Sequence, residues 1–135
     1  MLNHVVICLG SNVPSCRVIL DGAIAVLGTF FHDSPRMSLA YFNPSFNGIG
    51  QPYLNQVLEA TTTLNIDSLH RLCRTLERRA GRTPQSKVQG IMPLDIDIVI
   101  WNGTIVRPFD YTSPHFAHGY ANLHPHSASG QVGIQ

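Results

Sequence analysis

Two aspartates in a predicted strand are the residues whose types and spacing best suit chemistry. Residues 93–101 form an apolar, β-branched run with regular alternation, which predicts a β-strand. Asp95 and Asp97 then share one face, about 7 Å apart at Cα. Two carboxylates there repel each other, and aspartate is a poor strand former. A divalent cation such as Mg²⁺ would remove both objections; the alternative is a solvated strand face that carries two charges.

The same alternation assigns the other residues of this strand to faces. The apolar face is expected to carry Leu94, Ile96, Ile98 and Ile100. The face of the aspartates is expected to carry Val99 and Trp101 as well.

Composition limits the classes of protein that the chain can belong to. Its 135 residues, 44% of them hydrophobic, suffice for one domain with a core. The net charge of +1 gives no basic field for nucleic acid, but five of the nine basic residues are arginines between positions 71 and 82, which favours phosphate or carboxylate contacts. The three cysteines lack metal-type spacing and indicate reduced thiols in a cytoplasmic protein, and no apolar stretch is long enough to span a bilayer.

Hydrophobic periodicity and turn residues predict the elements that must position the aspartates. In order, they are a strand over 4–9, a helix over about 14–28, strands over 30–39 and 53–62, a helix capped by Asn65 or Asp67, and a hairpin turn at Asn102 and Gly103 after the aspartate strand. Residues 43–52, 83–92 and those after Pro108 are predicted to be loops. We expect a domain over 1–121 and a flexible tail over 122–135. The histidines His118, His124 and His126 are predicted to be solvated rather than zinc ligands.

This order of elements predicts an α+β fold of the ferredoxin-like βαββαβ type, an antiparallel sheet with both helices on one face and a C-terminal hairpin. The opposite face would then be free to bind a ligand. Because Leu94, Ile96 and Ile98 need the helix side, Asp95 and Asp97 are expected on the open face.

Five segments in this order resemble the 6-hydroxymethyl-7,8-dihydropterin pyrophosphokinase family. Residues 7–12 are similar to its opening G-S-N signature, 53–55 to its Y-L-N, 77–82 to its E-x-x-x-G-R, 94–98 to its L-D-L-D-I and 112–115 to its T-x-P-H. The resemblance implies transfer of pyrophosphate from ATP to a pterin alcohol in folate biosynthesis. It also implies two Mg²⁺ ions, used together with ATP.

The resemblance assigns a role to individual residues. The catalytic residues would be Arg82, Asp95 and Asp97, of which the two aspartates bind the metal ions. The pterin would be contacted by Tyr53 and Asn55, with Phe42 or Tyr53 packed on its ring. The nucleotide would be contacted by Glu77, Thr112 and His115.

The chain departs from the family pattern in the loop before the aspartates and after the histidine. Residues 88–92 lack the family's tryptophan, Met92 stands near its arginine, and the family's closing segment is absent. Two functions stay open: an enzyme of reduced efficiency, or a paralogue that binds pterin or nucleotide without turnover. A nucleic-acid binder that uses the open sheet ranks last, because paired aspartates repel phosphate. The expected partners are ATP and the pterin, without nucleic acid or membrane, for a monomer or weak homo-oligomer.

Overall fold

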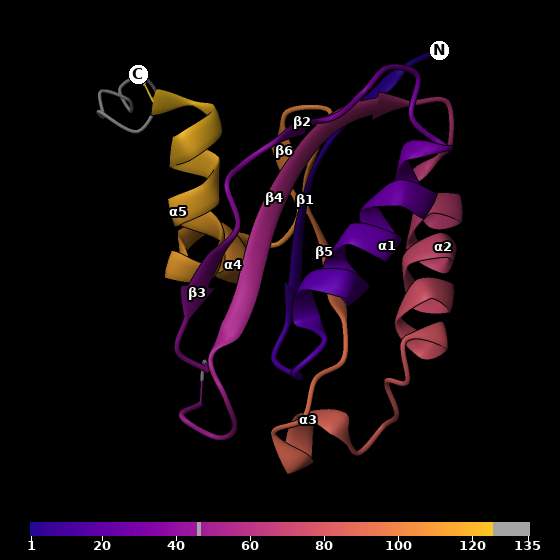
Figure 1. Ribbon diagram of the computed structural model, residues 1–135. Coiled ribbons are helices and arrows are strands. Elements are labelled where there is room, and N and C mark those ends of the chain that lie inside the picture. The colour runs from indigo at the N-terminus through magenta and orange to yellow at the C-terminus, as the bar shows by residue number, and fades with distance from the viewer. Residues whose placement is uncertain (46, 126–135) are drawn as a thin grey trace.

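The computed structural model describes residues 1–45 and 47–125 as a sheet between two layers of helices (Figure 1). The strands are β1 (Asn3–Ser11), β2 (Arg36–Met37), β3 (Tyr41–Asn43), β4 (Tyr53–Thr62), β5 (Asp95–Trp101) and β6 (Thr104–Ile105). The helices are α1 (Cys16–Gly28), α2 (Ile66–Arg79), α3 (Ser86–Gln89), α4 (Pro108–Thr112) and α5 (Pro114–Leu123). The predicted α+β class with an antiparallel sheet is confirmed.

The sheet is organised around β1, which pairs antiparallel with β4 on one side and with β5 on the other. Its strand order is β2-β4-β1-β5-β6, and β3 also pairs with β4. This central place explains why β1 is an apolar run, since a strand covered on both faces has few positions for polar side chains. It also puts the end of β1 between the Tyr53–Asn55 segment of β4 and the aspartates of β5.

α1 and α2 cover one face of the sheet (Figure 1). Each contributes an apolar stripe with a spacing of three and four residues, and α2 begins where the sequence predicts, because the Asn65 side chain accepts a hydrogen bond from the Ser68 backbone N–H at 2.8 Å. The buried residues of these helices are Leu20, Ala23, Leu27, Leu69, Cys73 and Leu76. They pack on Leu94, Ile96 and Ile98, which therefore lie on the helix side as expected.

The opposite face is only partly open, which corrects the sequence prediction. The residues after Pro108, predicted as loop, form α4 and α5, and α5 lies against this face (Figure 1). A second core cluster, between α5 and the sheet, comprises Val6, Cys8, Val57, Val99, Ile100, Phe116 and Leu123. α5 reaches Leu123, so packed structure continues into the predicted tail, of which residues 126–135 lie outside the described part.

A β-bulge in β5 corrects the predicted alternation. Ile7 pairs with Ile98 but the preceding Val6 pairs with Ile100, so Val99 is an extra residue on β5. Up to Ile98 the predicted faces hold. Beyond it Ile100 belongs to the cluster under α5, and Trp101 packs against the cluster under α1 and α2.

Several predicted segments differ in detail. The strand predicted over 30–39 is reduced to β2 and an isolated bridge of Phe31 to Thr62, since Pro35 lacks a backbone N–H. The loop predicted over 83–92 contains α3. Asn102 and Gly103 adopt φ values of 49° and 80° in the two-residue turn that joins β5 to β6.

Two of the histidines predicted to be solvated have partners instead. The ring of His118 lies 4.6 Å from that of Tyr41, and His124 Nε2 lies 2.5 Å from Glu59 Oε1. Burial raises the pKa of Glu59, but hydrogen bonds from His124 and His4 outweigh burial and lower it below its usual value. These contacts attach the end of α5 to the sheet.

Of the helices in the described ranges, none is long and apolar enough to cross a membrane.

We predict that Phe116→Ala lowers the free energy of unfolding by about 3–5 kcal/mol, because the Phe116 side chain of α5 is fully buried against the sheet and its removal leaves a cavity. The matched change at an exposed phenylalanine, Phe42→Ala, should alter it by no more than about 0.5 kcal/mol. Urea unfolding of both variants measures the difference. Equal losses would show that α5 is not part of the core.

Candidate functional site

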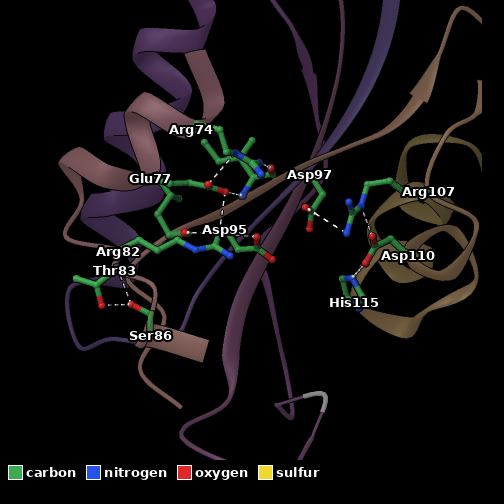
Figure 2. Close-up of polar contacts among 12 residues, drawn as sticks. Arg74, Glu77, Arg82, Thr83, Ser86, Asp95, Asp97, Arg107, Asp110 and His115 are labelled. Carbon is green, nitrogen blue, oxygen red and sulfur yellow. Dashed lines mark hydrogen bonds and ion pairs between the residues drawn. The ribbon is translucent and has the colours of Figure 1, made fainter. Parts of the chain in front are cut away.

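The part of the second face that α4 and α5 leave open carries the predicted carboxylates, Asp95 and Asp97, at adjacent outward positions of β5 (Figure 2). Burial, and next the neighbouring Asp95, raise the pKa of Asp97 well above its usual range, although the Arg107 guanidinium opposes them. The pair therefore favours a bound proton or cation over two bare charges. This pair is the centre of the candidate site.

The backbone between the two aspartates is held by side chains of α2. β6 pairs with β5 at Ile100 and Trp101, and within the described ranges no strand pairs with Ile96 along that edge. Glu77 Oε2 instead accepts the Ile96 N–H at 2.7 Å, and Arg74 Nη2 donates to the Ile96 carbonyl at 2.7 Å. Glu77 and Arg74 also form an ion pair of 2.9 Å. The α2 side chains thus replace a neighbouring strand and fix β5 at the aspartates.

Arg82 joins the end of α2 to the first aspartate. Gly81, with a φ of 105° that favours glycine, ends the helix and turns the chain towards β5. Arg82 Nη1 then lies 2.9 Å from Glu77 Oε2 and 3.0 Å from Asp95 Oδ1. Arg82 is therefore positioned beside the carboxylate pair.

Glu77 has a different environment from the one its predicted nucleotide contact requires. Glu77 is only 3% exposed, and its two carboxylate oxygens face Arg74, Arg82 and the Ile96 amide. Burial raises its pKa, against the hydrogen bond from that amide. The geometry makes Glu77 a positioning residue, which holds Arg82 and β5.

A second arginine, missed by the sequence analysis, lies on the other side of the pair (Figure 2). Arg107 immediately precedes α4, and its Nη2 lies 3.6 Å from Asp97 Oδ1 while its Nε donates to Asp110 Oδ2. The other oxygen of Asp110 lies 3.1 Å from His115 Nε2. The hydrogen bond from His115 lowers the pKa of Asp110. Burial acts in the opposite direction, and Arg107 lowers this pKa further. His115 thus stands near the site, through Asp110.

Asn55 and Tyr53 lie beside the aspartates on the same face. Asn55, 3% exposed, pairs with Gly10 of β1, and its Nδ2 donates to the Leu9 carbonyl at 3.4 Å. A Cβ on Gly10 would lie 2.8 Å from Asn55 Nδ2 and 3.2 Å from the Tyr53 ring, so glycine is required for the close approach of these side chains. Burial, and then the Asp95 carboxylate, raise the pKa of Tyr53 above its usual value.

Two buried polar atoms of this region lack a hydrogen-bond partner among the described residues. They are the Asn55 Oδ1 acceptor and the Asn43 Nδ2 donor. Tyr53 pairs with Asn43 across β3 and β4, so Asn43 lies on the same face as Asn55. A buried polar atom without a partner is costly, and a flat heterocycle with an N–H and a ring acceptor would satisfy both. Sequence analysis missed Asn43, because nothing in its loop-like context marks it.

Phe42, unlike Asn55 and Tyr53, is not brought to the site as expected. Phe42 pairs with Leu54 of the helix side and is 65% exposed, so it faces away from Asn55. The Thr112 hydroxyl donates to the carbonyls of Phe109 and Pro108 within α4. Met92 is 2% exposed, so an arginine substituted there would bury its charge instead of facing phosphate.

Asn12, the last residue of the G-S-N segment, connects the two loops that border the site. Its Nδ2 donates to the carbonyls of Gly90 at 2.9 Å and Gln51 at 3.3 Å, and its Oδ1 accepts the Met92 N–H at 2.7 Å. The backbones of Gly50 and Gly90 approach so closely that a Cβ on Gly50 would lie 2.1 Å from the Gly90 carbonyl oxygen. Asn12 is thus a structural residue of the site's border.

The oxygen donors of the pair fit a hard cation. Mg²⁺ is commonly bound by one or two carboxylates and completes its coordination with water and substrate phosphates. The described ranges contain no cluster of three or more histidine, cysteine or acidic residues that could hold a metal ion. Asp95 and Asp97 are the residues that would hold such an ion.

Comparison with known proteins gives two matches. The sequence model of the family described as 7,8-dihydro-6-hydroxymethylpterin-pyrophosphokinase (HPPK) matches residues 6–125. A curated relative from Helicobacter pylori (strain ATCC 700392 / 26695), the 2-amino-4-hydroxy-6-hydroxymethyldihydropteridine pyrophosphokinase, is 32% identical over 121 residues, which cover 84% of this chain and 71% of the relative. Both matches include the carboxylate pair and the Tyr53–Asn55 segment within a span of more than half of the chain.

Proposed function

Because the chain belongs to the 7,8-dihydro-6-hydroxymethylpterin-pyrophosphokinase (HPPK) family, we propose that it transfers pyrophosphate from ATP to 6-hydroxymethyl-7,8-dihydropterin in folate biosynthesis. The observation that carries this proposal is the convergence of Asp95, Asp97, Arg82 and Asn55 on one uncovered end of the sheet. In the strand order of the sheet, β1 lies between β4 and β5, and this arrangement supports a ferredoxin-like fold.

The reaction joins the pterin hydroxyl to the β-phosphorus of ATP. The hydroxyl oxygen attacks that phosphorus, the bond from it to the oxygen bridging the α-phosphate breaks, and AMP leaves with the electron pair. The hydroxyl proton is released. Such a transfer needs alignment of the reactants and stabilisation of the phosphate charge more than covalent participation of the protein.

The residues of this chain divide these tasks. Arg82, held by Glu77 at the carboxylate pair, offers N–H donors to the phosphate oxygens on which charge develops. Asp95 and Asp97 would hold two Mg²⁺ ions, which neutralise phosphate charge and polarise the attacking hydroxyl when bound. Asn55 Oδ1 and Asn43 Nδ2 orient the pterin by its polar edge, and Tyr53 lies beside them.

A second candidate function is binding of pterin or nucleotide without turnover. The observation that favours it lies in the loop over 83–92, where Met92 is buried and Val88, not an arginine, is exposed. This side of the site therefore supplies few positive charges to a triphosphate.

As further parts of the proposal, the protein is cytoplasmic and a monomer or weak homo-oligomer, with ATP and the pterin as its partners.

The test of the proposed function is AMP formation from ATP and 6-hydroxymethyl-7,8-dihydropterin with Mg²⁺. We expect AMP in amounts equal to the diphosphorylated pterin, none without the pterin, and loss of product with EDTA. Binding of both ligands without any AMP would exclude the enzyme and leave the binding paralogue.

We predict that Asn55→Ala weakens binding of the pterin by roughly 1–3 kcal/mol, because it removes the acceptor that the pterin satisfies. Calorimetry with the pterin measures this loss, and affinity for the α,β-methylene analogue of ATP should hardly change. Asn3→Ala at the opposite end of β1 is the matched control. If both ligands lose affinity equally, Asn55 is structural.

A further inference from the structure

We propose that Arg107 is a second phosphate-binding residue of the nucleotide site, held in position by the Asp110–His115 pair. The inference rests on the proposed function. Arg107 lies outside all the segments that resemble the family. One side-chain arrangement, a buried carboxylate that holds an arginine against an aspartate of the pair, occurs twice around the carboxylate pair (Figure 2).

The first construction consists of Glu77, Arg82 and Asp95. A buried carboxylate, Glu77, holds an arginine, which in turn reaches an aspartate of the pair at 3.0 Å. The second consists of Asp110, Arg107 and Asp97. Here the buried carboxylate of Asp110 accepts from Arg107 Nε, and Arg107 Nη2 lies 3.6 Å from Asp97 Oδ1.

The two arginines approach the pair from opposite sides. Arg82 comes from the end of α2, and Arg107 from the segment between β6 and α4 (Figure 2). A triphosphate that meets the carboxylate pair through metal ions would therefore have a guanidinium on each side. A guanidinium carries five N–H donors in a planar fork, more than its contacts to Asp110 and Asp97 use.

Stability alone does not explain the second construction. The Arg107 side chain is 49% exposed, against 26% for Arg82, and ion pairs of such exposed arginines contribute little to folding. Asp110, by contrast, is buried, and its two oxygens face Arg107 and His115. A buried carboxylate engaged on both oxygens fixes the direction of an otherwise mobile arginine, which is what recognition of phosphate requires.

The loop over 83–92 gives this arginine its importance. Its Met92 points into the core, and its one basic residue, Lys87, stands on α3. Positive charge that the loop does not supply can come from the α4 side, where Arg107 already faces Asp97. Asp110 is then a positioning residue, and His115 acts on the phosphate site through it.

The test is calorimetric titration of the full chain with the α,β-methylene analogue of ATP in Mg²⁺, and separately with the pterin. We expect Arg107→Ala to weaken binding of the analogue about tenfold or more, the usual loss for a hydrogen bond to a charged group, and to leave pterin affinity within twofold. Arg71→Ala removes the same charge from an exposed position of α2 and should change neither affinity. Arg107→Gln carries the same expectation if Arg107→Ala does not fold.

The role of Asp110 is tested by a double-mutant cycle. Asp110→Asn should weaken binding of the analogue in the wild-type chain and have little further effect in Arg107→Ala, because it acts through that arginine. Unchanged affinity of Arg107→Ala for the analogue, or an equal loss of analogue and pterin binding, would overturn the proposal. If the wild type binds both ligands without forming AMP, the proposed enzyme fails, whereas these titrations still decide the role of Arg107.

Discussion

The site depends on how the outer edge of β5 is closed. At Ile96 this edge has no strand partner within the described ranges, so its N–H and carbonyl would otherwise face solvent. Glu77 and Arg74 of α2 take both groups, at 2.7 Å each. Since Ile96 lies between Asp95 and Asp97, the same two contacts fix the direction of both carboxylates. A helix that covers one face of the sheet thereby determines the geometry of the other face.

The same contacts organise the charges of the site. Glu77 is buried and shares its oxygens among two arginines and one amide, which satisfies a carboxylate that would otherwise be destabilising. Arg82 transmits this arrangement to Asp95. Asp97, more buried than Asp95, has Arg107 at a longer distance, and its pKa is raised first by burial and then by repulsion from Asp95. A bound cation would relieve that repulsion, so the structure favours the metal ions that the family's chemistry uses.

Much of the fold follows from local patterns in the sequence. The Asn65 cap, the stripes of α1 and α2, and the apolar face from Leu94 to Ile98 are set by side-chain spacing, and all three agree with the structure. The bulge at Val99 was missed because a single inserted residue leaves no compositional mark in an apolar run. α5 was missed although Phe116, Tyr120 and Leu123 recur at helical spacing, because the surrounding glycine, histidine and serine residues resemble a loop.

The residues of the site divide in the same way. Asp95, Asp97, Arg82 and Asn55 belong to short contiguous motifs, so the sequence alone suggests them as candidates, and the structure brings them close together. The contacts of Glu77 with Ile96, and of Arg107 with Asp97, join residues distant in the chain, and only the folded structure shows them. The face of β3 on which Phe42 lies depends on its pairing with Leu54 of β4, which the sequence alone does not show.

The central claim is that α2 positions the carboxylate pair through Glu77, and Mg²⁺-dependent binding of the α,β-methylene analogue of ATP to Glu77→Ala tests it most directly. Glu77→Gln is the matched control, because its amide oxygen still accepts the Ile96 N–H. The account predicts that the folded Glu77→Ala chain loses about tenfold or more in affinity for the analogue and that Glu77→Gln loses less. Wild-type affinity in folded Glu77→Ala would contradict it.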